Sequence, residues 1–521
     1  MAYFFNSDFK NNEFELMSKD KFFVDKTLLI DEINSLIGIK DRFVCITRPR
    51  RFGKTVNAMM LASYYSKNAN FKSLFDELEI SKETSYLNHL NKHNVIYITL
   101  NEVPKANCTY GEFIGRYINL LSEDLKECYP DLKLNENLSM SDIFTQVYQK
   151  YSQSFIFIID EWDYIFNNNL FSKEDRENFL QFLKDLLKDR PYVELTYMTG
   201  VLPIAKYSSG SALNMFDEYT FLNDVTFDKY FGFTDSEVKA LCSKQKNISM
   251  DELRDWYDGY KTQNNHEIYN PRSVVFALRK GVCQSYWTNT GPMDEILYYI
   301  NSDVDAVKDD VVKMVSEVPL EIKLKGYGAE QKELNNRNQI LSAMTIYGFL
   351  SYCNEELRIP NKELRIKFDD ALEDKSMGAV SEIVMKSNEM LLATVRKDTK
   401  TMEKLIQEAH DINIPVIKYN DENSLACIVT LVYLSARSKY KIVREMPAGI
   451  GFADFIFYPN DKSKPAFIIE LKKDSTPDEA LKQIQEKRYA LALKDYTGQK
   501  LAVGIAYDSK LKKHSVKIED I

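Results

Sequence analysis

A five-residue apolar run, Phe43–Thr47, leads directly into the segment Arg48-Pro-Arg-Arg-Phe-Gly-Lys-Thr55, and a helical pattern follows. The segment matches the phosphate-loop pattern GxxxxGK[ST] at Gly53, Lys54 and Thr55, whereas Arg48 stands at the position of the first glycine. Such a loop aims backbone N–H groups at an anion from the N-terminus of a helix. The order of strand, loop and helix therefore predicts an α/β fold with a phosphate site.

Each side chain of this loop has an expected role. In the motif, the lysine contacts the β- and γ-phosphates and the hydroxyl holds Mg²⁺, so we expect Lys54 and Thr55 to bind ATP with Mg²⁺. Because a side chain replaces glycine at the loop's start, we expect a wider loop with Arg48, Arg50 or Arg51 near the anion. The alternative is a basic turn that matches by chance, but the flanking strand and helix favour the phosphate site.

A second strand supplies the acids that such a site needs. The run Phe155-Ile-Phe-Ile-Ile-Asp160-Glu161 is apolar until its last two residues. We expect Asp160 to bind Mg²⁺ through water or Thr55, and Glu161 to polarise the attacking water. Thr199 ends the next predicted strand and is the candidate γ-phosphate sensor, although strand-end threonines usually cap or turn the chain. Together with the loop, these residues indicate an NTPase site.

The pattern of elements changes twice along the 521 residues, for which about three domains are expected. Residues 22–200 alternate short apolar strands with helical patterns, which predicts a mostly parallel sheet. The next two hundred residues read as mostly helical. From about residue 412 the order is helix, three strands, helix and strand, which is a compact domain by itself. We therefore expect three domains: 1–210, 211–410 and 411–521.

The expected elements have definite bounds. The strands are Phe43–Thr47, Val95–Leu100, Phe155–Ile159 and Val193–Thr199 in the first part, and Lys441–Met446, Phe452–Tyr458, Ala466–Leu471 and Leu501–Tyr507 in the last. The longer helices are Gln331–Tyr347, Met377–Arg396, Ser424–Ser438 and Pro477–Leu493.

The last part carries a second group of charged residues. Asp454 lies on one predicted strand, and Glu470 and Lys472 share a face of the next because they are two residues apart. Two carboxylates about 4 Å apart repel by roughly 4 kcal/mol at an effective dielectric near 20, so they need a cation. Oxygen ligands select Mg²⁺ or Mn²⁺, which would acidify a bound water while Lys472 orients it. A solvated strand end is the alternative, but the order of the elements favours a nuclease site.

Several further segments occur together with these: Phe23-Val-Asp-Lys-Thr27, Phe231-Gly-Phe-Thr234, Trp256-Tyr-Asp-Gly-Tyr260, Tyr269-Asn-Pro-Arg-Ser273 and Tyr286-Trp-Thr-Asn-Thr290. Over nearly its whole length the chain resembles a bacterial family that joins an AAA-type ATPase-like region to a C-terminal PD-(D/E)XK nuclease-like domain. The resemblance implies a P-loop NTPase-like parallel sheet, a helical middle or lid region, and a small α/β domain like that of restriction endonucleases.

The resemblance also implies roles for single residues. Glu422 matches an additional acidic position of the nuclease domain, and Gln483 matches its helix motif. Asp25 and Lys26 belong to a motif that we expect near the nucleotide. In this family the loop without the first glycine is normal. The apolar residues at 452 and 453 depart from the polar or basic residues expected there, which weakens the expected grip on substrate.

Charge and cysteine content bear on compartment and partner. The net charge is −9, yet residues 411–521 hold 18 Lys and Arg against 15 Asp and Glu, so only this part would favour a polyanion. Seven cysteines without a CxxC pair fit a reducing cytoplasm. No secretory signal is visible, and the longest apolar stretch, Ile340–Cys353, is shorter than the roughly 20 residues that cross a membrane. We therefore expect a cytoplasmic protein without a membrane partner.

Two hypotheses about function follow. The first is a Mg²⁺-dependent nuclease that cuts nucleic acid, preferably DNA, under control of ATP binding, in defence or DNA processing. The second is an ATP-dependent switch or nucleic-acid-binding module with an inactive nuclease fold. The intact pair of Glu470 and Lys472 favours the first, and the mild charge favours the second. Assembly into a homo-oligomer stays open.

Overall fold

The computed structural model describes residues 2–68, 70–134, 138–204, 213–288, 298–300, 305–324, 336–411 and 422–521. The chain divides into two compact units. Residues 1–290, 324–334 and 341–354 form the first, and residues 291–323, 335–340 and 355–521 form the second. The three-domain division expected from the sequence is finer than this and stays a prediction. No helix of the described chain is long and apolar enough to cross a membrane.

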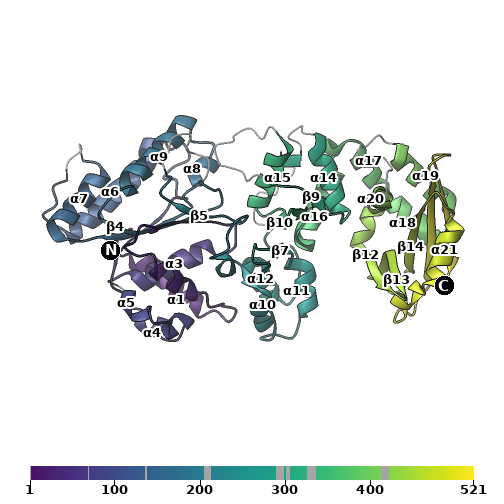
Figure 1. Cartoon of the computed structure of the whole chain (residues 1–521), viewed down its shortest axis with the longest axis horizontal. Coiled ribbons are helices and arrows are strands. Elements are labelled where there is room, and N and C mark those ends of the chain that lie inside the picture. Colours follow the sequence, from purple (N-terminus) through teal and green to yellow (C-terminus); the bar gives the residue numbers. More distant parts are fainter. Residues whose placement is uncertain are drawn as a thin grey trace. The chain divides into compact units, whose positions relative to one another are not determined.

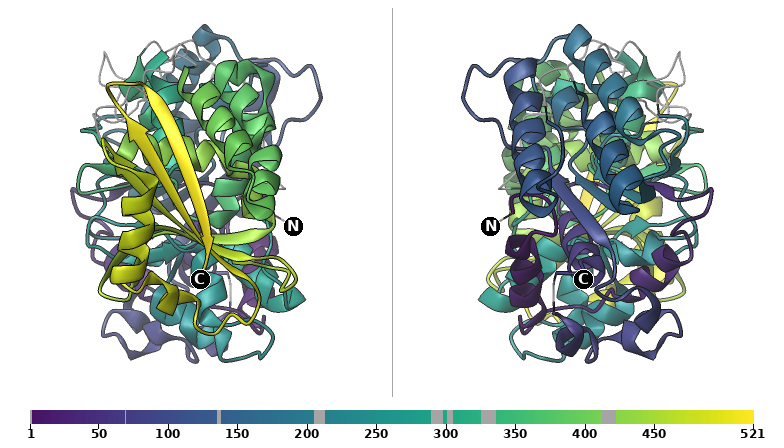
Figure 2. Two further views of the ribbon diagram at one scale, coloured as in Figure 1. Left: turned by 90° about the vertical axis from the view of Figure 1, so that its right-hand side faces the viewer. Right: turned by 90° about the vertical axis from the view of Figure 1, so that its left-hand side faces the viewer.

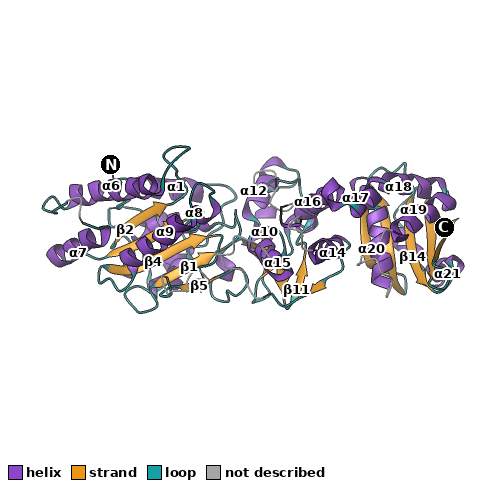
Figure 3. Cartoon of the chain, turned by 90° about the horizontal axis from the view of Figure 1, so that it is seen from above, coloured by secondary structure: helices purple, strands orange, loops and turns teal. Residues whose placement is uncertain are grey.

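A parallel five-stranded sheet is the centre of the first unit (Figure 3). Its order is β2-β3-β4-β1-β5, and every pair of neighbours is parallel. The strands are β1 (Phe43–Thr47), β2 (Asn94–Thr99), β3 (Phe155–Asp160), β4 (Val193–Gly200) and β5 (Asp217–Tyr219). The four strands expected in this part are confirmed within two residues, and β5 is an addition. A parallel sheet collects the carboxyl ends of its strands at one edge, where the loop after β1 lies.

Helices cover both faces of this sheet (Figure 1). Alternate strand residues face opposite sides: Phe155 and Phe157 pack in one core, and Ile156 and Ile158 pack in the other. The first core includes helices α6 (Tyr110–Cys128), α7 (Met140–Tyr151) and α9 (Lys173–Leu187). The second includes α1 (Asp8–Ser18), α2 (Leu28–Asn34) and α3 (Lys54–Tyr65). The short helices are α4 (Lys72–Phe75), α5 (Tyr86–His89) and α8 (Tyr164–Asn167).

The first unit continues into a smaller sheet with its own core. The strands β6 (Phe233–Thr234), β7 (Tyr260–Lys261) and β8 (Glu267–Tyr269) form an antiparallel sheet in the order β6-β8-β7. Three helices pack around a core that contains Val238, Leu253 and Val274. They are α10 (Asp235–Cys242), α11 (Met250–Tyr257) and α12 (Pro271–Lys280). The strand β10 (Ser351–Cys353) also belongs to the first unit.

The second unit ends in a five-stranded sheet of order β12-β13-β14-β15-β16. Only β14 and β15 are parallel, and helix α21 connects them. Helix α21 packs on one face, and α19 and α20 pack on the other (Figure 2). The elements are β12 (Tyr440–Ala448), β13 (Gly451–Pro459), β14 (Ala466–Lys473), β15 (Lys500–Asp508), β16 (Lys513–Asp520), α19 (Thr399–Asp411), α20 (Glu422–Val432) and α21 (Pro477–Glu486).

The remaining elements are mostly helical, as expected for the middle of the chain. They are α14 (Asp305–Val315), α15 (Arg337–Ile346), α16 (Lys362–Glu373), α17 (Ala379–Met385), α18 (Ser387–Arg396), β9 (Leu320–Glu321) and β11 (Glu356–Arg358). The single helix expected over Met377–Arg396 is wrong, because the chain breaks between α17 and α18. The helix expected to end at Leu493 ends at Glu486, since Arg488 adopts a left-handed backbone with φ 57°.

The strand β16 was not expected from the sequence. From Lys513 to Ile518 polar or charged side chains alternate with aromatic or apolar ones, and the strand pairs with β15 along one edge only. One face of such an edge strand is solvated, so its apolar content is low. The C-terminal domain therefore has one strand more than the predicted order.

Candidate functional site

The loop after β1 brings a helix N-terminus to the carboxyl edge of the parallel sheet. Gly53 precedes α3 with a left-handed backbone, φ 89°, and a Cβ placed there would meet nothing within 4 Å. Arg51 has φ 72°, so this loop turns through two left-handed residues. Thr55 is exposed in the first turn of α3. The free N–H groups of this turn suit an anion, as the sequence predicted.

Lys54 closes the loop on itself. Its Nζ donates to the carbonyl oxygens of Arg48 at 2.8 Å and Pro49 at 2.9 Å, and its side chain is buried. Burial lowers the pKa of Lys54 to about 8, against the opposing pull of the carboxylates of Asp163 and Asp160. The ammonium group is therefore held inside the site by both loop carbonyls and acids.

The predicted acids lie at the ends of the neighbouring strands. Asp160 is buried, and its Oδ1 accepts hydrogen bonds from the Thr199 hydroxyl and, at 3.1 Å, from the backbone N–H of Glu161. Burial raises the pKa of Glu161, the negative charge of Asp160 adds to this, and a hydrogen bond with Asn101 opposes it. Glu161 also has a left-handed backbone, φ 54°. Thr199 thus contacts Asp160, and Asn101 joins the site unpredicted.

Asp163 is a third acid that was missed in the sequence. Its side chain is buried, and its Oδ2 accepts from the backbone N–H groups of Val201 at 3.0 Å and Leu202 at 2.8 Å. Burial raises its pKa, and these bonds together with the charge of Lys54 oppose the rise. The sequence could have indicated Asp163 by its position, three residues after Asp160 at the end of the same strand.

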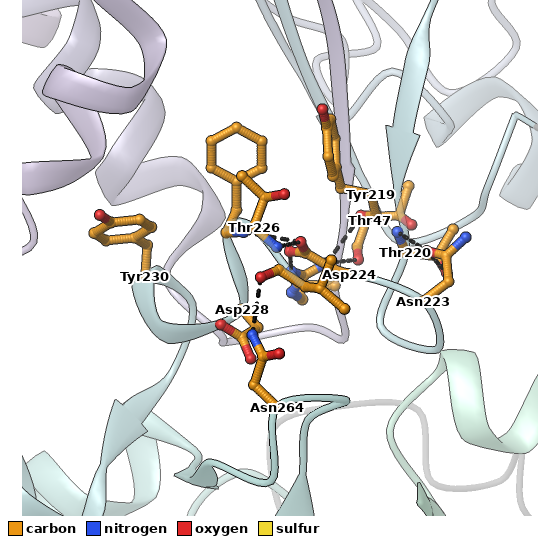
Figure 4. Close-up of polar contacts among 12 residues, drawn as sticks. Thr47, Tyr219, Thr220, Asn223, Asp224, Thr226, Asp228, Tyr230 and Asn264 are labelled. Carbon is orange, nitrogen blue, oxygen red and sulfur yellow. Dashed lines mark hydrogen bonds and ion pairs between the residues drawn. The ribbon is translucent and has the colours of Figure 1, made fainter.

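Arg48 takes a different place from the one expected. Its guanidinium donates to the carbonyl oxygens of Thr47 at 2.8 Å and Tyr219 at 2.9 Å and forms an ion pair with Asp224. Asp224 also accepts from the backbone N–H of Thr226 at 2.8 Å (Figure 4). Both charged side chains are only 2% exposed. Arg48 therefore ties the loop to the segment after β5, and of the three arginines Arg50 and Arg51 remain for an anion.

The loop is also docked on the small antiparallel sheet. Phe52 is fully buried, with its ring 5.3 Å from that of Tyr260 and 6.5 Å from that of Trp287. The backbone N–H of Gly232 donates to the Phe52 carbonyl oxygen at 3.0 Å. A Cβ at Gly232 would lie 3.3 Å from the Phe52 ring and 3.1 Å from the Tyr269 carbonyl oxygen. The loop and the end of β8 thus approach each other here.

Arg272 follows β8 in the first turn of α12. Its Nε is buried and finds no hydrogen-bond partner in the described part of the chain, and its guanidinium lies 4.7 Å from the centre of the Phe276 ring. Burial lowers its pKa, and the positive charge of Arg51 lowers it further. Two guanidinium groups near each other favour an anion between them. Arg272 is therefore a further candidate contact, which the motif Tyr-Asn-Pro-Arg-Ser indicated only by resemblance.

The second candidate site lies on the C-terminal sheet. The antiparallel register of β13 and β14 pairs Phe455 with Ile469, so Asp454 and Glu470 are the next positions along the two strands. Directly opposite residues have Cβ atoms about 4.5–5.5 Å apart. The Asp454 Oδ2 accepts from the backbone N–H of Leu471 at 2.7 Å. The structure thus brings the predicted acids together.

Glu470 is the centre of this site. Its side chain is 2% exposed, and its Oε1 accepts from Lys472 Nζ at 3.0 Å and from the Gln483 amide. Its Oε2 is buried and has no hydrogen-bond partner among the described residues. Burial, and then the charge of Asp454, raise the pKa of Glu470 to about 7. Gln483 also donates to the Tyr489 hydroxyl at 3.1 Å, so the helix after β14 holds this carboxylate in place.

A divalent cation fits this donor set. The unpartnered Oε2 of Glu470 and the neighbouring Asp454 carboxylate are hard oxygen donors, which Mg²⁺ and Mn²⁺ prefer. Among the described residues no group of three or more His, Cys, Asp and Glu gathers around a common point. Glu422 begins α20, but its side chain lies outside the described part of the structure. Its predicted neighbourhood to the acids therefore stays a prediction.

Asp25 and Lys26 have structural partners. Asp25 accepts from the backbone N–H groups of Thr27 and Glu79, both at 2.8 Å. Lys26 donates to Glu237 and to the Lys229 carbonyl oxygen, each at 2.7 Å. These contacts connect the segment before α2 with α10.

Two family models match the chain. Residues 9–209 match the family described as predicted AAA-ATPase, and residues 420–516 match the PD-(D/E)XK nuclease superfamily, in the order expected. A Walker-type ATPase of Pyrococcus abyssi is 12% identical over 66% of this chain and 94% of its own, with a TM-score of 0.34. The ORC2 protein of Aeropyrum pernix, solved with ADPNP and ADP, is 11% identical over 70% and 94%, with a TM-score of 0.32. No curated protein matches the chain.

Proposed function

We propose that this chain, which joins an AAA-ATPase-like domain to a domain of the PD-(D/E)XK nuclease superfamily, is an ATP-binding, metal-dependent nuclease. The C-terminal domain hydrolyses phosphodiester bonds of nucleic acid, with DNA as the expected substrate. ATP and Mg²⁺ or Mn²⁺ are its cofactors, and nucleotide binding controls cleavage. The presence of an ATPase-like domain beside a nuclease-like one is the support for this control.

One observation carries the nuclease proposal. Glu470 is buried with one oxygen unpartnered, opposite Asp454 and beside Lys472. A fold gains nothing from a buried carboxylate beside a second, half-buried one unless a cation joins them. When bound, a divalent cation acidifies water and offsets negative charge on a phosphate. Asp454 and Glu470 are the residues that would hold it.

The other side chains have positioning roles in this proposal. The Lys472 ammonium is placed to orient the attacking water and to offset charge on the scissile phosphate. The Gln483 amide donates to Oε1 of Glu470 and leaves Oε2 as the oxygen that would bind the cation. The Lys472 side chain is 23% exposed, so part of it is accessible to a substrate strand.

The nucleotide site is proposed at the loop after β1. Lys54 exchanges its loop carbonyls for phosphate oxygens, and the backbone N–H groups from Gly53 onward bind the same anion. Thr55 and Asp160 would hold Mg²⁺, and Glu161 would polarise the attacking water. All seven cysteines are free, which agrees with the reducing cytoplasm that we propose as the compartment.

A second candidate function has a specific observation in its favour. The described residues offer two carboxylates rather than three to a cation at the C-terminal site. A domain with too few ligands would bind nucleic acid without cutting it, and the chain would then be an ATP-dependent switch.

Incubation of the purified protein with labelled DNA and RNA tests both functions. We expect cleavage that needs Mg²⁺ or Mn²⁺, that changes when ATP is added, and that is absent from Asp454→Ala. Binding without cleavage under every metal condition would favour the switch. Activity in Asp454→Ala equal to that of the wild type would contradict the proposed site.

A further inference from the structure

Two large apolar side chains are exposed beside the C-terminal acids. They belong to the hairpin of β12 and β13, whose two-residue turn is Gly449 and Ile450. Ile450 is 70% exposed and Phe452 is 63% exposed. Most of the surface of both side chains is therefore left outside the core.

The hairpin tip is held in place by the backbone that follows α21. The backbone N–H of Ile450 donates to the Lys487 carbonyl oxygen at 2.9 Å. Gly449 has φ 57°, and a Cβ there would lie 1.9 Å from the same oxygen. A Cβ at Gly451 would lie 3.0 Å from the Tyr489 hydroxyl. Such close packing fixes the direction of the hairpin, so the exposed ring of Phe452 is presented by an ordered element.

Phe452 lies next to the proposed cation site. It precedes Asp454 by two residues on β13, so the Cα atoms of the two residues lie about one strand repeat, roughly 7 Å, apart.

Positive charge flanks the same hairpin. Lys487 and Arg488 are exposed, and the hairpin tip packs on their backbone. Neither side chain forms an ion pair or hydrogen bond with a residue in the described part of the chain. Lys472 adds a third cation beside Glu470. An exposed aromatic ring on a hairpin whose tip packs on the backbone of Lys487 and Arg488 suits a strand whose bases stack and whose phosphates pair with lysine and arginine.

We propose that this hairpin binds unpaired nucleic acid, with a nucleobase stacked on Phe452 and adjacent phosphates on Lys487 and Arg488. The inference rests on the proposed nuclease function and adds its substrate class. In an intact duplex the bases stack on one another, so the ring would face phosphates and lose its hydration without gaining a contact. Single strands, flaps and frayed ends offer free base faces.

Binding is measured on the full chain with Glu470→Ala as background, so that no substrate is cut. Fluorescence anisotropy compares a labelled single-stranded DNA, the matching single-stranded RNA and the blunt duplex DNA. We expect Phe452→Ala to weaken single-strand binding by about 5- to 150-fold and to leave duplex binding almost unchanged. Phe452→Trp should restore binding, and Leu511→Ala, which removes a side chain 69% exposed in the same domain, is the matched control.

The outcomes separate the inference from the proposed function. If nucleic-acid binding depends on Phe452 but the wild type cleaves nothing, the stacking surface is supported and the nuclease function is contradicted. If blunt duplex is cleaved as fast as single strand, and the cleavage rate is unchanged in Phe452→Ala, the nuclease function is supported and the stacking surface is overturned. If Phe452→Ala lowers the melting temperature, Phe452→Leu replaces it, because leucine keeps the apolar volume without the ring face. Self-association that depends on Phe452, with unchanged nucleic-acid binding, would make the hairpin a protein interface and overturn the proposal.

Discussion

The two candidate sites differ in whether their buried charged groups have partners within the fold. At the phosphate loop each buried charged group that we described is compensated within the fold: Arg48 pairs with Asp224, and Lys54 is held by carbonyls and acids. At the C-terminal site Glu470 keeps a buried oxygen without a partner, and its pKa rises to about 7. The buried charges of the first site have partners within the fold, whereas the proposed cation would give the free oxygen of the second its partner. Substitutions at the two sites should therefore change stability in opposite directions.

The largest effect is expected from Glu470→Ala. Loss of the ligand should lower metal-dependent cleavage on the order of 10³-fold or more, since a cation contributes several kcal/mol to the transition state. Its thermal midpoint should stay equal or rise, because a buried charge has been removed. Cleavage of labelled DNA and thermal unfolding are the measurements. Glu486→Ala, an exposed acid of α21, is the control, and a strongly lowered midpoint in Glu470→Ala would contradict the comparison.

The opposite result is expected at the phosphate loop. Asp224→Ala leaves the Arg48 guanidinium buried and unpaired, which should cost about 3–5 kcal/mol of unfolding free energy. The double variant Arg48→Met with Asp224→Leu should recover most of that loss. Asp251→Ala is the control, because Asp251 is 95% exposed and its ion pair with Arg254 spans 3.8 Å. Denaturant unfolding measures all four proteins, and equal stabilities of Asp224→Ala and Asp251→Ala would refute the compensation at this site.

These differences mark how far the sequence predicts the molecule. The phosphate loop and its acids were predicted because each motif is contiguous and lies at a strand end, as Gly53, Lys54 and Asp160 show. Asp454 and Glu470 were predicted from the order and alternation of two strands. These are local properties of a sequence.

Long-range partners could not be predicted in the same way. Nothing near Arg48 in the sequence indicates Asp224, which follows it by 176 residues. Arg272 likewise reaches the loop only because Phe52 and Gly232 dock the small sheet on it. The edge strand β16 was missed because its solvated face removes the apolar signal. Tertiary contacts decide each of these features.

Lys54→Ala tests whether the phosphate loop binds ATP. Removal of a charge-assisted contact to phosphate should weaken ATP binding about 10- to 100-fold. Glu161→Gln should keep ATP affinity and slow hydrolysis. Calorimetry with ATP and Mg²⁺ measures both, with Lys72→Ala on the exposed α4 as the control. Equal affinities of Lys54→Ala and the wild type would remove the nucleotide site from this loop.

Glu470→Gln tests by pH how the buried charge of Glu470 affects stability. The folded-state pKa of Glu470 lies above the usual 4.5, so the folded chain binds more protons than the unfolded chain between about pH 4.5 and 7. The wild type should lose stability as the pH rises through this window. Glu470→Gln should therefore be more stable by about 2 kcal/mol at pH 8 and no more stable at pH 4. Denaturant unfolding at both values measures the difference, and a gain that is the same at both would contradict the assigned cause.

The smallest effect is expected from a substitution of Arg272, which lies beside the phosphate loop. The positive charge of Arg51 lowers the pKa of Arg272, and among the described residues the Arg272 Nε, like the Glu470 Oε2, has no hydrogen-bond partner. A phosphate bound at the loop would supply the missing negative charge. Arg272→Ala should then weaken ATP binding about 5-fold, because a partly exposed charge contact contributes roughly 1 kcal/mol. Arg279→Ala is the matched control on the same helix, since Arg279 already pairs with Asp20.

Calorimetry with ATP and with ADP extends the test. A loss of affinity for ATP alone places Arg272 at the γ-phosphate, and an equal loss for both nucleotides places it at the β-phosphate. Unchanged affinity for both nucleotides would mean that the loop binds phosphate without help from α12.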